Sequence, residues 1–133
     1  MKKILLTASL LPGMIACHNT NSCEKVMCTA DFRMITVQLQ DSSGNPFVAD
    51  KIISINNTNQ ILHTDTGMLL GDGRYYTIAD DSHLKLLQQD TSYRSIIMKV
   101  IKNNDTLASA SYTIAADCCH VSKVAGKDTI VIP

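Results

Sequence analysis

The residues that could do chemistry, judged by type and spacing, are the cysteines of this chain. There are five: Cys23 and Cys28 precede most of the chain, Cys118 and Cys119 are adjacent near its end, and Cys17 stands apart. In an oxidising compartment such cysteines form structural disulfides, and an odd number leaves one cysteine for another role. Disulfide bonding of Cys23, Cys28, Cys118 and Cys119 is therefore our leading interpretation.

The first seventeen residues indicate that the compartment is oxidising, because they predict export. Lys2 and Lys3 form a positive n-region, the apolar run 4–11 is followed by Pro12-Gly13, and Met14-Ile15-Ala16-Cys17 ends the segment. This layout is typical of a secretory signal peptide and is too short for a permanent membrane-spanning helix. The last four residues resemble the lipobox of bacterial lipoproteins, which implies cleavage before Cys17 and diacylation of its sulfur. Lipidation at Cys17 leaves an even number of cysteines for disulfides.

Four cysteines allow three pairings. Two of these link the N-terminal pair to Cys118 and Cys119 and close loops of roughly ninety residues. In the chain-entropy model one such bridge constrains the unfolded state by about 4 to 5 kcal/mol. The third pairing needs a vicinal bridge with a distorted peptide, so we rank it last. Adjacent strand residues point to opposite faces, so we expect the strand to end or bulge at Asp117-Cys118.

A metal or thiol site is the alternative interpretation. Thiolates of Cys23, Cys28, Cys118 and Cys119 with the imidazole of His120 are soft ligands of the kind that zinc or copper binds. Directly adjacent ligands are geometrically awkward, and neither cysteine pair has the Cys-x-x-Cys spacing of a redox centre. The alternative function is an envelope metal-binding or thiol-redox protein that uses Cys118, Cys119 and His120.

Other candidate groups give weaker signals. Oxygen ligands for calcium could come from acidic residues around a glycine-rich segment, although their spacing does not match an EF-hand loop and acidic turn residues usually solvate loops. These residues are Asp65, Asp72, Asp80 and Asp81. His63 and His83 are scattered, and we expect His83 to face solvent. No Gly-x-Ser-x-Gly elbow is present, so we predict no catalytic residue and no cofactor.

Length and charge fit one domain that does not bind nucleic acid. Of the 133 residues, we expect 1–16 to be the signal peptide, 17–22 a polar tether and 23–133 a single domain. Cleavage removes Lys2 and Lys3 from 12 basic residues and leaves 10, against 12 acidic residues. Such a balance does not provide the basic stripe that nucleic-acid binding requires.

Short alternating segments predict an all-β fold. Between Phe32 and Gln40, apolar residues alternate with polar ones, which is the period of a half-buried strand. Further strands are expected at 47–56, 60–64, 74–79, 93–102, 106–117 and 129–132, with a loop at 67–73 and one helix at 82–89 capped by Ser82. This spacing favours a single antiparallel β-sandwich, immunoglobulin-like or transthyretin-like. The expected core residues are Ile35, Val37, Leu39, Ile53, Ile55, Ile78, Ile97, Tyr112, Ile114 and Ile130.

A family resemblance supports the sandwich. The pattern Val37-x-Leu39-x-Asp41-x-x-Gly44-Asn45-Pro46, followed by Thr66-Gly67 and Gly71-Asp72-Gly73-x-Tyr75, resembles carboxypeptidase-regulatory-like and related immunoglobulin-like domains. The match covers residues 35–80 and departs from the pattern after Pro46. It implies a non-catalytic accessory, stalk or binding module. With the lipobox and Asp117-Cys118-Cys119-His120, the chain is also similar to small lipoproteins of Bacteroidota-type bacteria.

These observations together predict a lipid-anchored cell-envelope binding or structural module without catalytic activity. The expected partners are a membrane, through the lipid on Cys17, and another envelope protein or a glycan. His18 follows the acylated cysteine, so the Asp signal that retains some lipoproteins at the inner membrane is missing. We therefore expect the outer membrane as the location.

Overall fold

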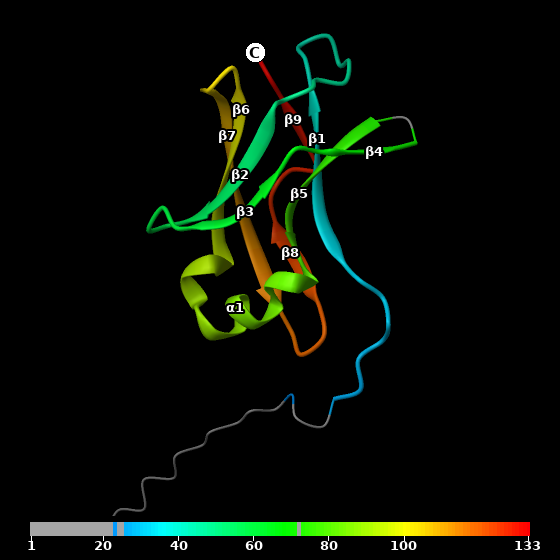
Figure 1. The fold of residues 1–133 in the computed structure, drawn as a ribbon, viewed down its shortest axis with the longest axis vertical. Coiled ribbons are helices and arrows are strands. Elements are labelled where there is room, and N and C mark those ends of the chain that lie inside the picture. Colours follow the sequence, from blue (N-terminus) through cyan, green and yellow to red (C-terminus); the bar gives the residue numbers. More distant parts are fainter. Residues whose placement is uncertain (1–22, 24–25, 72) are drawn as a thin grey trace, which may run out of the picture.

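A computed structural model describes residue 23, residues 26–71 and residues 73–133. The predicted signal peptide, the tether and the lipidation of Cys17 lie outside the described residues, as does Asp72 of the acidic group. Within the described part, nine strands form two sheets that face each other, with a short helix at one end (Figure 1). The prediction of an all-β sandwich with one short helix is confirmed.

One sheet has four strands and the other has five. The first contains, in spatial order, β4 (Met68–Leu70), β5 (Gly73–Asp80), β1 (Met34–Gln40) and β9 (Thr129–Val131). The second contains, in spatial order, β3 (Ile61–Asp65), β2 (Lys51–Asn56), β6 (Ser95–Lys102), β7 (Asp105–Ala116) and β8 (Val121–Ala125). Each sheet places its interior side chains against the other sheet, as in other two-layer β folds.

The pairing of β1 with β9 departs from a purely antiparallel sandwich. The other paired strands run antiparallel, but β9 runs parallel to β1 over Gln38–Gln40. After β8 the chain crosses from the second sheet to the first. There β9 runs along the edge of β1 in the same direction as β1. A turn between neighbouring strands could not produce this pairing, because parallel strands need a crossover connection.

Two strands escaped prediction and one begins later than expected. β4 forms a hairpin with β5 inside the expected loop, and β8 was not foreseen. β2 begins at Lys51 because the residues before it bond to other strands: the Phe47 amide donates to the Leu39 carbonyl, and the Asp50 amide to the Ile101 carbonyl. The segment 46–50 is therefore a link between the sheets.

The hairpin of β6 and β7 is confirmed as predicted. Its turn contains Asn103 and Asn104, whose φ angles are 51° and 68°. Positive φ at two successive residues matches the right-handed twist of the flanking strands, and asparagine tolerates this conformation better than most residues. β7 then pairs with β8 on its other side, so β7 is an interior strand of its sheet.

The helical segment connects the two sheets and is capped by Asp80, not by Ser82 as predicted. It consists of the 3₁₀ turn η1 (Asp81–His83) and α1 (Leu84–Gln89), and the 3₁₀ turn η2 (Thr91–Arg94) leads into β6. Oδ1 of Asp80 accepts a 2.9 Å hydrogen bond from the Ser82 amide, and Nδ1 of His83 lies 3.3 Å from the Asp80 amide nitrogen. These reciprocal bonds form a capping box.

The core lies between the sheets, and its membership corrects the prediction at two positions. Ile53 is only partly buried and Ile97 is 37 % exposed, whereas their neighbours Ile52 and Ile96 are fully buried. Both strands carry isoleucine on both faces, so apolar alternation does not identify the inner face. Ile55 is buried but lies outside the main cluster. The other predicted core residues belong to it: Ile35, Val37, Leu39, Ile78, Tyr112, Ile114 and Ile130.

Gly126 closes the core over Tyr112 and gives a testable prediction. Its φ is +128°, and a Cβ there would lie 2.6 Å from Cε1 of Tyr112 and closer still to Cδ1. Tyr112 is 1 % exposed, and its hydroxyl donates to the Lys127 carbonyl, so the ring has no room to move. We expect Gly126→Ala to lower the free energy of unfolding by roughly 3 kcal/mol, through overpacking and backbone strain.

Gly44→Ala is the matched control, measured by the same denaturation experiment. Gly44 also has a positive φ, of +83°, but no atom lies within 4 Å of a Cβ at this position. Backbone strain alone should cost it about 1 kcal/mol. Equal losses in the two variants would show that Gly126 is not packed on the ring.

Candidate functional site

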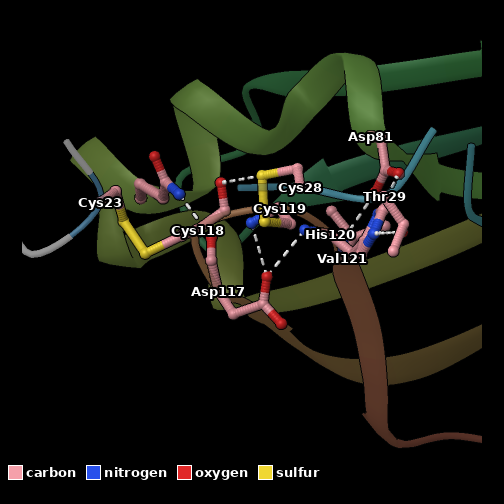
Figure 2. Close-up of a disulfide and its surroundings, with 10 residues drawn as sticks. Cys23, Cys28, Thr29, Asp81, Asp117, Cys118, Cys119, His120 and Val121 are labelled. Carbon is pink, nitrogen blue, oxygen red and sulfur yellow. Dashed lines mark hydrogen bonds and ion pairs between the residues drawn. A yellow bond between two sulfur atoms is a disulfide. The ribbon is translucent and has the colours of Figure 1, made fainter. Parts of the chain in front are cut away.

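The predicted bend after β7 is confirmed as a tight turn over Asp117, Cys118, Cys119 and His120. The Asp117 amide donates to the His120 carbonyl, and Oδ1 of Asp117 accepts hydrogen bonds from the amides of Cys119 and His120, each 2.7 Å long. The bonds from these amides, Cys119 first, hold the pKa of Asp117 below its ordinary value. The turn ends the strand at Ala116 and directs both cysteines toward the N-terminal segment (Figure 2).

Two disulfides join this turn to the N-terminal segment. Cys23 bonds to Cys118 and Cys28 bonds to Cys119, with Cα–Cα distances of 5.1 and 5.2 Å (Figure 2). The prediction of disulfides between these four residues is confirmed, and the pairing is one of the two cross-linking arrangements. The bridges span 95 and 91 residues of sequence. α1 packs behind the turn, where Nε2 of Gln88 donates to the Asp117 carbonyl.

Next to the bridges, a partly buried hydrogen-bonded group joins three segments of the chain. Oδ2 of Asp81 lies 2.8 Å from Nδ1 of His120 and accepts a 2.9 Å bond from the Arg33 amide, while its Oδ1 accepts a 2.8 Å bond from the Val121 amide. The other ring nitrogen of His120, Nε2, lies 3.0 Å from Oγ1 of Thr29. His120 is 7 % exposed. We call Thr29, His120 and Asp81 the hydroxyl–imidazole–carboxylate chain.

Electrostatics in this chain favour the ionised carboxylate. Burial alone raises the pKa of Asp81, but the bonds from His120, Arg33 and Val121 outweigh burial, and the net pKa lies below the ordinary value. A carboxylate that accepts two backbone amides and an imidazole N–H is stabilised in its charged form. Asp81 therefore holds the N-terminal segment, η1 and the start of β8 together as an anion.

The structure separates the predicted acidic group. Asp65 accepts bonds from the amides of Gly67 and Thr77, Asp80 caps η1, and Asp81 serves the hydroxyl–imidazole–carboxylate chain. Each carboxylate therefore has its own structural role among the described residues. The calcium hypothesis also includes Asp72, which lies outside them.

Two histidines that look scattered in the sequence lie side by side. The rings of His63 and His83 meet edge to face, with centroids 5.0 Å apart and an interplanar angle of 82°. His83 is only partly exposed, so the expectation that it simply faces solvent is wrong: Nδ1 of its ring lies 2.9 Å from Oδ1 of Asp80. Burial, and next the proximity of His83, hold the pKa of His63 below its ordinary value.

A groove of about 420 Å³ runs between β1 and β8. β9 pairs with β1 only over Gln38–Gln40, which leaves the first half of β1 without a neighbouring strand on that side among the described residues. The groove is lined by Arg33, Met34, Ile35, Thr36, Val121, Ser122, Lys123 and Asp128. Lys123 and Asp128 form an ion pair within it. An unpaired strand edge beside polar and charged side chains is suited to bind an extended segment of another chain.

The sequence predicted the bridges but missed both histidine environments. The cysteines were identified because predicted export, and the even number of cysteines left after Cys17, favour disulfides, although the pairing itself stayed open. The contacts of His120 with Asp81, and of His63 with His83, join residues far apart in the chain, and no spacing rule reports such contacts. Only the contact of His83 with Asp80 could have been predicted from nearby residues, because a residue three positions after an N-cap can complete a capping box.

Comparison with protein-family models, with curated proteins and with solved structures finds no match for this chain. Its functional interpretation therefore depends on its own residues. Among the described residues, no helix has the length and apolar character needed to cross a membrane.

Proposed function

We propose that this protein is a lipid-anchored cell-envelope module that binds or supports other envelope components without catalysing a reaction. The observation that carries the proposal is the use of all four cysteines after residue 17 in two disulfides. Stable disulfides are typical of exported proteins. They leave Cys17 as the single cysteine free for acylation, as the lipobox resemblance implies.

The position of the bridges suits an anchored protein. A load applied at Cys17 reaches Cys23 first and passes through its disulfide to Cys118, directly after β7. β7 pairs with β6 over 8 residue pairs and with β8 on its other side. The load therefore enters an interior strand and does not peel β1 from the sheet.

The groove between β1 and β8 is the surface that we assign to the partner. An extended segment of another envelope protein can add to the open edge of β1, where main-chain hydrogen bonds supply affinity. To test this assignment, a photo-crosslinking residue at the exposed Ser122 should capture a partner in native envelopes. The same residue at the exposed Asn57, in the turn after β2, is the control and should capture none. Equal capture at both positions would contradict the assignment.

Membrane attachment has a direct test. We expect Cys17→Ala to move most of the protein from the membrane fraction to the soluble fraction, because the acyl chains supply the binding free energy. The combined variant Cys28→Ser with Cys119→Ser removes one bridge and should remain membrane-bound. Membrane attachment of Cys17→Ala at the wild-type level would contradict the lipid anchor.

The metal-binding or thiol-redox alternative stays a prediction. Its thiolates form only if both bridges are reduced, and His120 would have to leave Asp81 and Thr29 to become a ligand.

Ester hydrolysis is a second candidate function, favoured by the hydroxyl–imidazole–carboxylate chain. Thr29 Oγ1, His120 and Asp81 have the connectivity of a nucleophilic triad: the hydroxyl meets one ring nitrogen and the carboxylate orients the other. Oγ1 of Thr29 would attack an ester carbonyl while Nε2 of His120 takes its proton and passes it to the departing alcohol. Water would then release the acid and restore the hydroxyl. Thr29 is exposed, so a substrate can reach it.

A chromogenic ester assay decides this candidate. If it holds, the wild type turns over the ester, Thr29→Ala loses the activity and Thr29→Ser retains it, because serine keeps the nucleophile. Thr106→Ala, at another exposed threonine, is the matched control and should not change the rate. Equal rates in Thr29→Ala and the wild type would remove hydrolysis at this site from consideration.

A further inference from the structure

Three side chains with metal-binding atoms meet where the two sheets approach each other beside η1. His63 comes from β3 of the second sheet, Asp80 ends β5 of the first sheet, and His83 belongs to η1. One ligand atom from each lies within 4.8 Å of the others, and all three residues are partly buried. We call these residues the inter-sheet histidine cluster.

Each side chain of the cluster has a potential ligand atom that makes no hydrogen bond among the described residues. Neither ring nitrogen of His63 has a hydrogen-bond partner among the described residues, although the side chain is partly buried. The hydrogen bonds and the ion pair of the His83 ring use Nδ1, and those of the Asp80 carboxylate use Oδ1. Nε2 of His83 and Oδ2 of Asp80 are thus not engaged by other side chains of the described part. The ring nitrogens of His63, Nε2 of His83 and Oδ2 of Asp80 are therefore available to coordinate an ion.

The strand next to the cluster adds an independent observation. Ser54 of β2 lies opposite His63 in the register of β2 and β3, and it is fully buried. The hydroxyl of Ser54 has no hydrogen-bond partner within the described residues. A buried polar atom without a partner is costly, and such atoms often mark a site where an ion or ordered water binds.

We propose that His63, Asp80 and His83 bind a divalent transition-metal ion of the zinc type. Two imidazoles and one carboxylate match the nitrogen and oxygen preferences of zinc, with a fourth position left for water. Zinc–nitrogen bonds of about 2.0 Å place tetrahedral ligand atoms roughly 3.3 Å apart. The ligand atoms of the three side chains now lie within 4.8 Å of one another. Side-chain rotations that move each atom by about 1 Å would bring them to the separation in a zinc site.

Such an ion would join the two sheets beside η1, close to the contact of Asp81 with His120. His63 and Asp80 lie on strands of different sheets, and β3 packs against β5 there. Metal binding to the folded chain raises its stability by mass action. The ion would stabilise the edge strand β3 against separation from β5. This inference does not depend on the lipid anchor or on the partner of the groove.

The test uses the purified full chain with both disulfides intact, titrated with Zn²⁺ alone in a calorimeter. We expect one ion per chain, a higher melting temperature with Zn²⁺, and visible absorption of tetrahedral Co²⁺ as a spectroscopic signature. His63→Gln is the cleanest variant, because the His63 ring makes no hydrogen bond among the described residues. We expect at least tenfold weaker binding for His63→Gln and for His83→Gln.

His18 supplies the matched control, because it is not one of the cluster residues. His18→Gln removes an imidazole from elsewhere in the chain and should leave the Zn²⁺ affinity and the Co²⁺ spectrum unchanged. Asp80→Asn should also weaken Zn²⁺ binding, and the exposed Asp31→Asn is its control, which should leave the affinity unchanged. Absence of stoichiometric binding, or unchanged affinity in His63→Gln, would overturn the proposal.

Discussion

Removing both disulfides should lower the free energy of unfolding by about 7 kcal/mol, while removing either one alone should cost only roughly 2 to 3 kcal/mol. The asymmetry arises because the two bridges close nearly the same loop, spanning 95 and 91 residues. Once one bridge is present, the other closes only a small ring through 23–28 and 118–119. In the chain-entropy model the large loop is worth about 4.7 kcal/mol and a ring of about eight residues about 2.5 kcal/mol.

Chemical denaturation of three variants measures this prediction. The first pair is Cys23→Ser with Cys118→Ser, the second is Cys28→Ser with Cys119→Ser, and the third combines all four substitutions. Met27→Ala, at a neighbouring side chain that is 97 % exposed, is the control and should change stability by less than about 0.5 kcal/mol. A loss near 5 kcal/mol in each single-bridge variant would mean that the bridges constrain the unfolded chain independently.

Asp81→Asn should lower the free energy of unfolding by roughly 3 kcal/mol, because Asp81 joins three segments. The substitution removes the charge that accepts bonds from Arg33, Val121 and His120, and charge-assisted hydrogen bonds of this kind each contribute about 1.5 to 3 kcal/mol. Its side chain is only 10 % exposed, so water cannot replace all of these partners. The exposed Asp31→Asn is the control.

The same variant should change the acid limb of the stability profile. The pKa of Asp81 is lower in the folded chain than its ordinary value of about 4, so the folded state stabilises the anion. That contribution is complete above the ordinary pKa and is lost as the pH falls through the folded pKa. The stability difference between wild type and Asp81→Asn should therefore shrink below about pH 4. If the stability difference between the two proteins stayed constant below about pH 4, the charge of Asp81 would not be what stabilises the contacts with Arg33, Val121 and His120.

Local patterns predicted most of the fold, and their failures have a physical cause. Alternation identified the strand at β1, and the asparagines after β6 identified its hairpin, because both signals lie within a few residues. β2 and β6 carry isoleucine on both faces, and the inner face of β2 also contains Ser54 and Asn56. The inner face therefore depends on what packs against it, and the sequence pattern could not report that.

The sequence predicted the disulfides of the candidate site but not its hydrogen-bonded contacts. Cysteine parity and the geometry of adjacent residues led to the bridges and to the bend at Asp117. By contrast, Asp81 with His120, and His63 with His83, are brought together only by the packing of strands that are distant in sequence. In each case a single histidine or aspartate looked like an ordinary polar residue until the fold supplied its partner.

Two disulfides use the four later cysteines, and we propose that the chain is exported and acylated at Cys17. The most direct test is the intact mass of the protein purified from its native membrane, before and after alkylation under denaturing, non-reducing conditions. We predict a chain that lacks sixteen residues, carries lipid, and gains alkyl groups at four cysteines only after reduction. Thiols that react without reduction, or an unprocessed chain without lipid, would contradict the account.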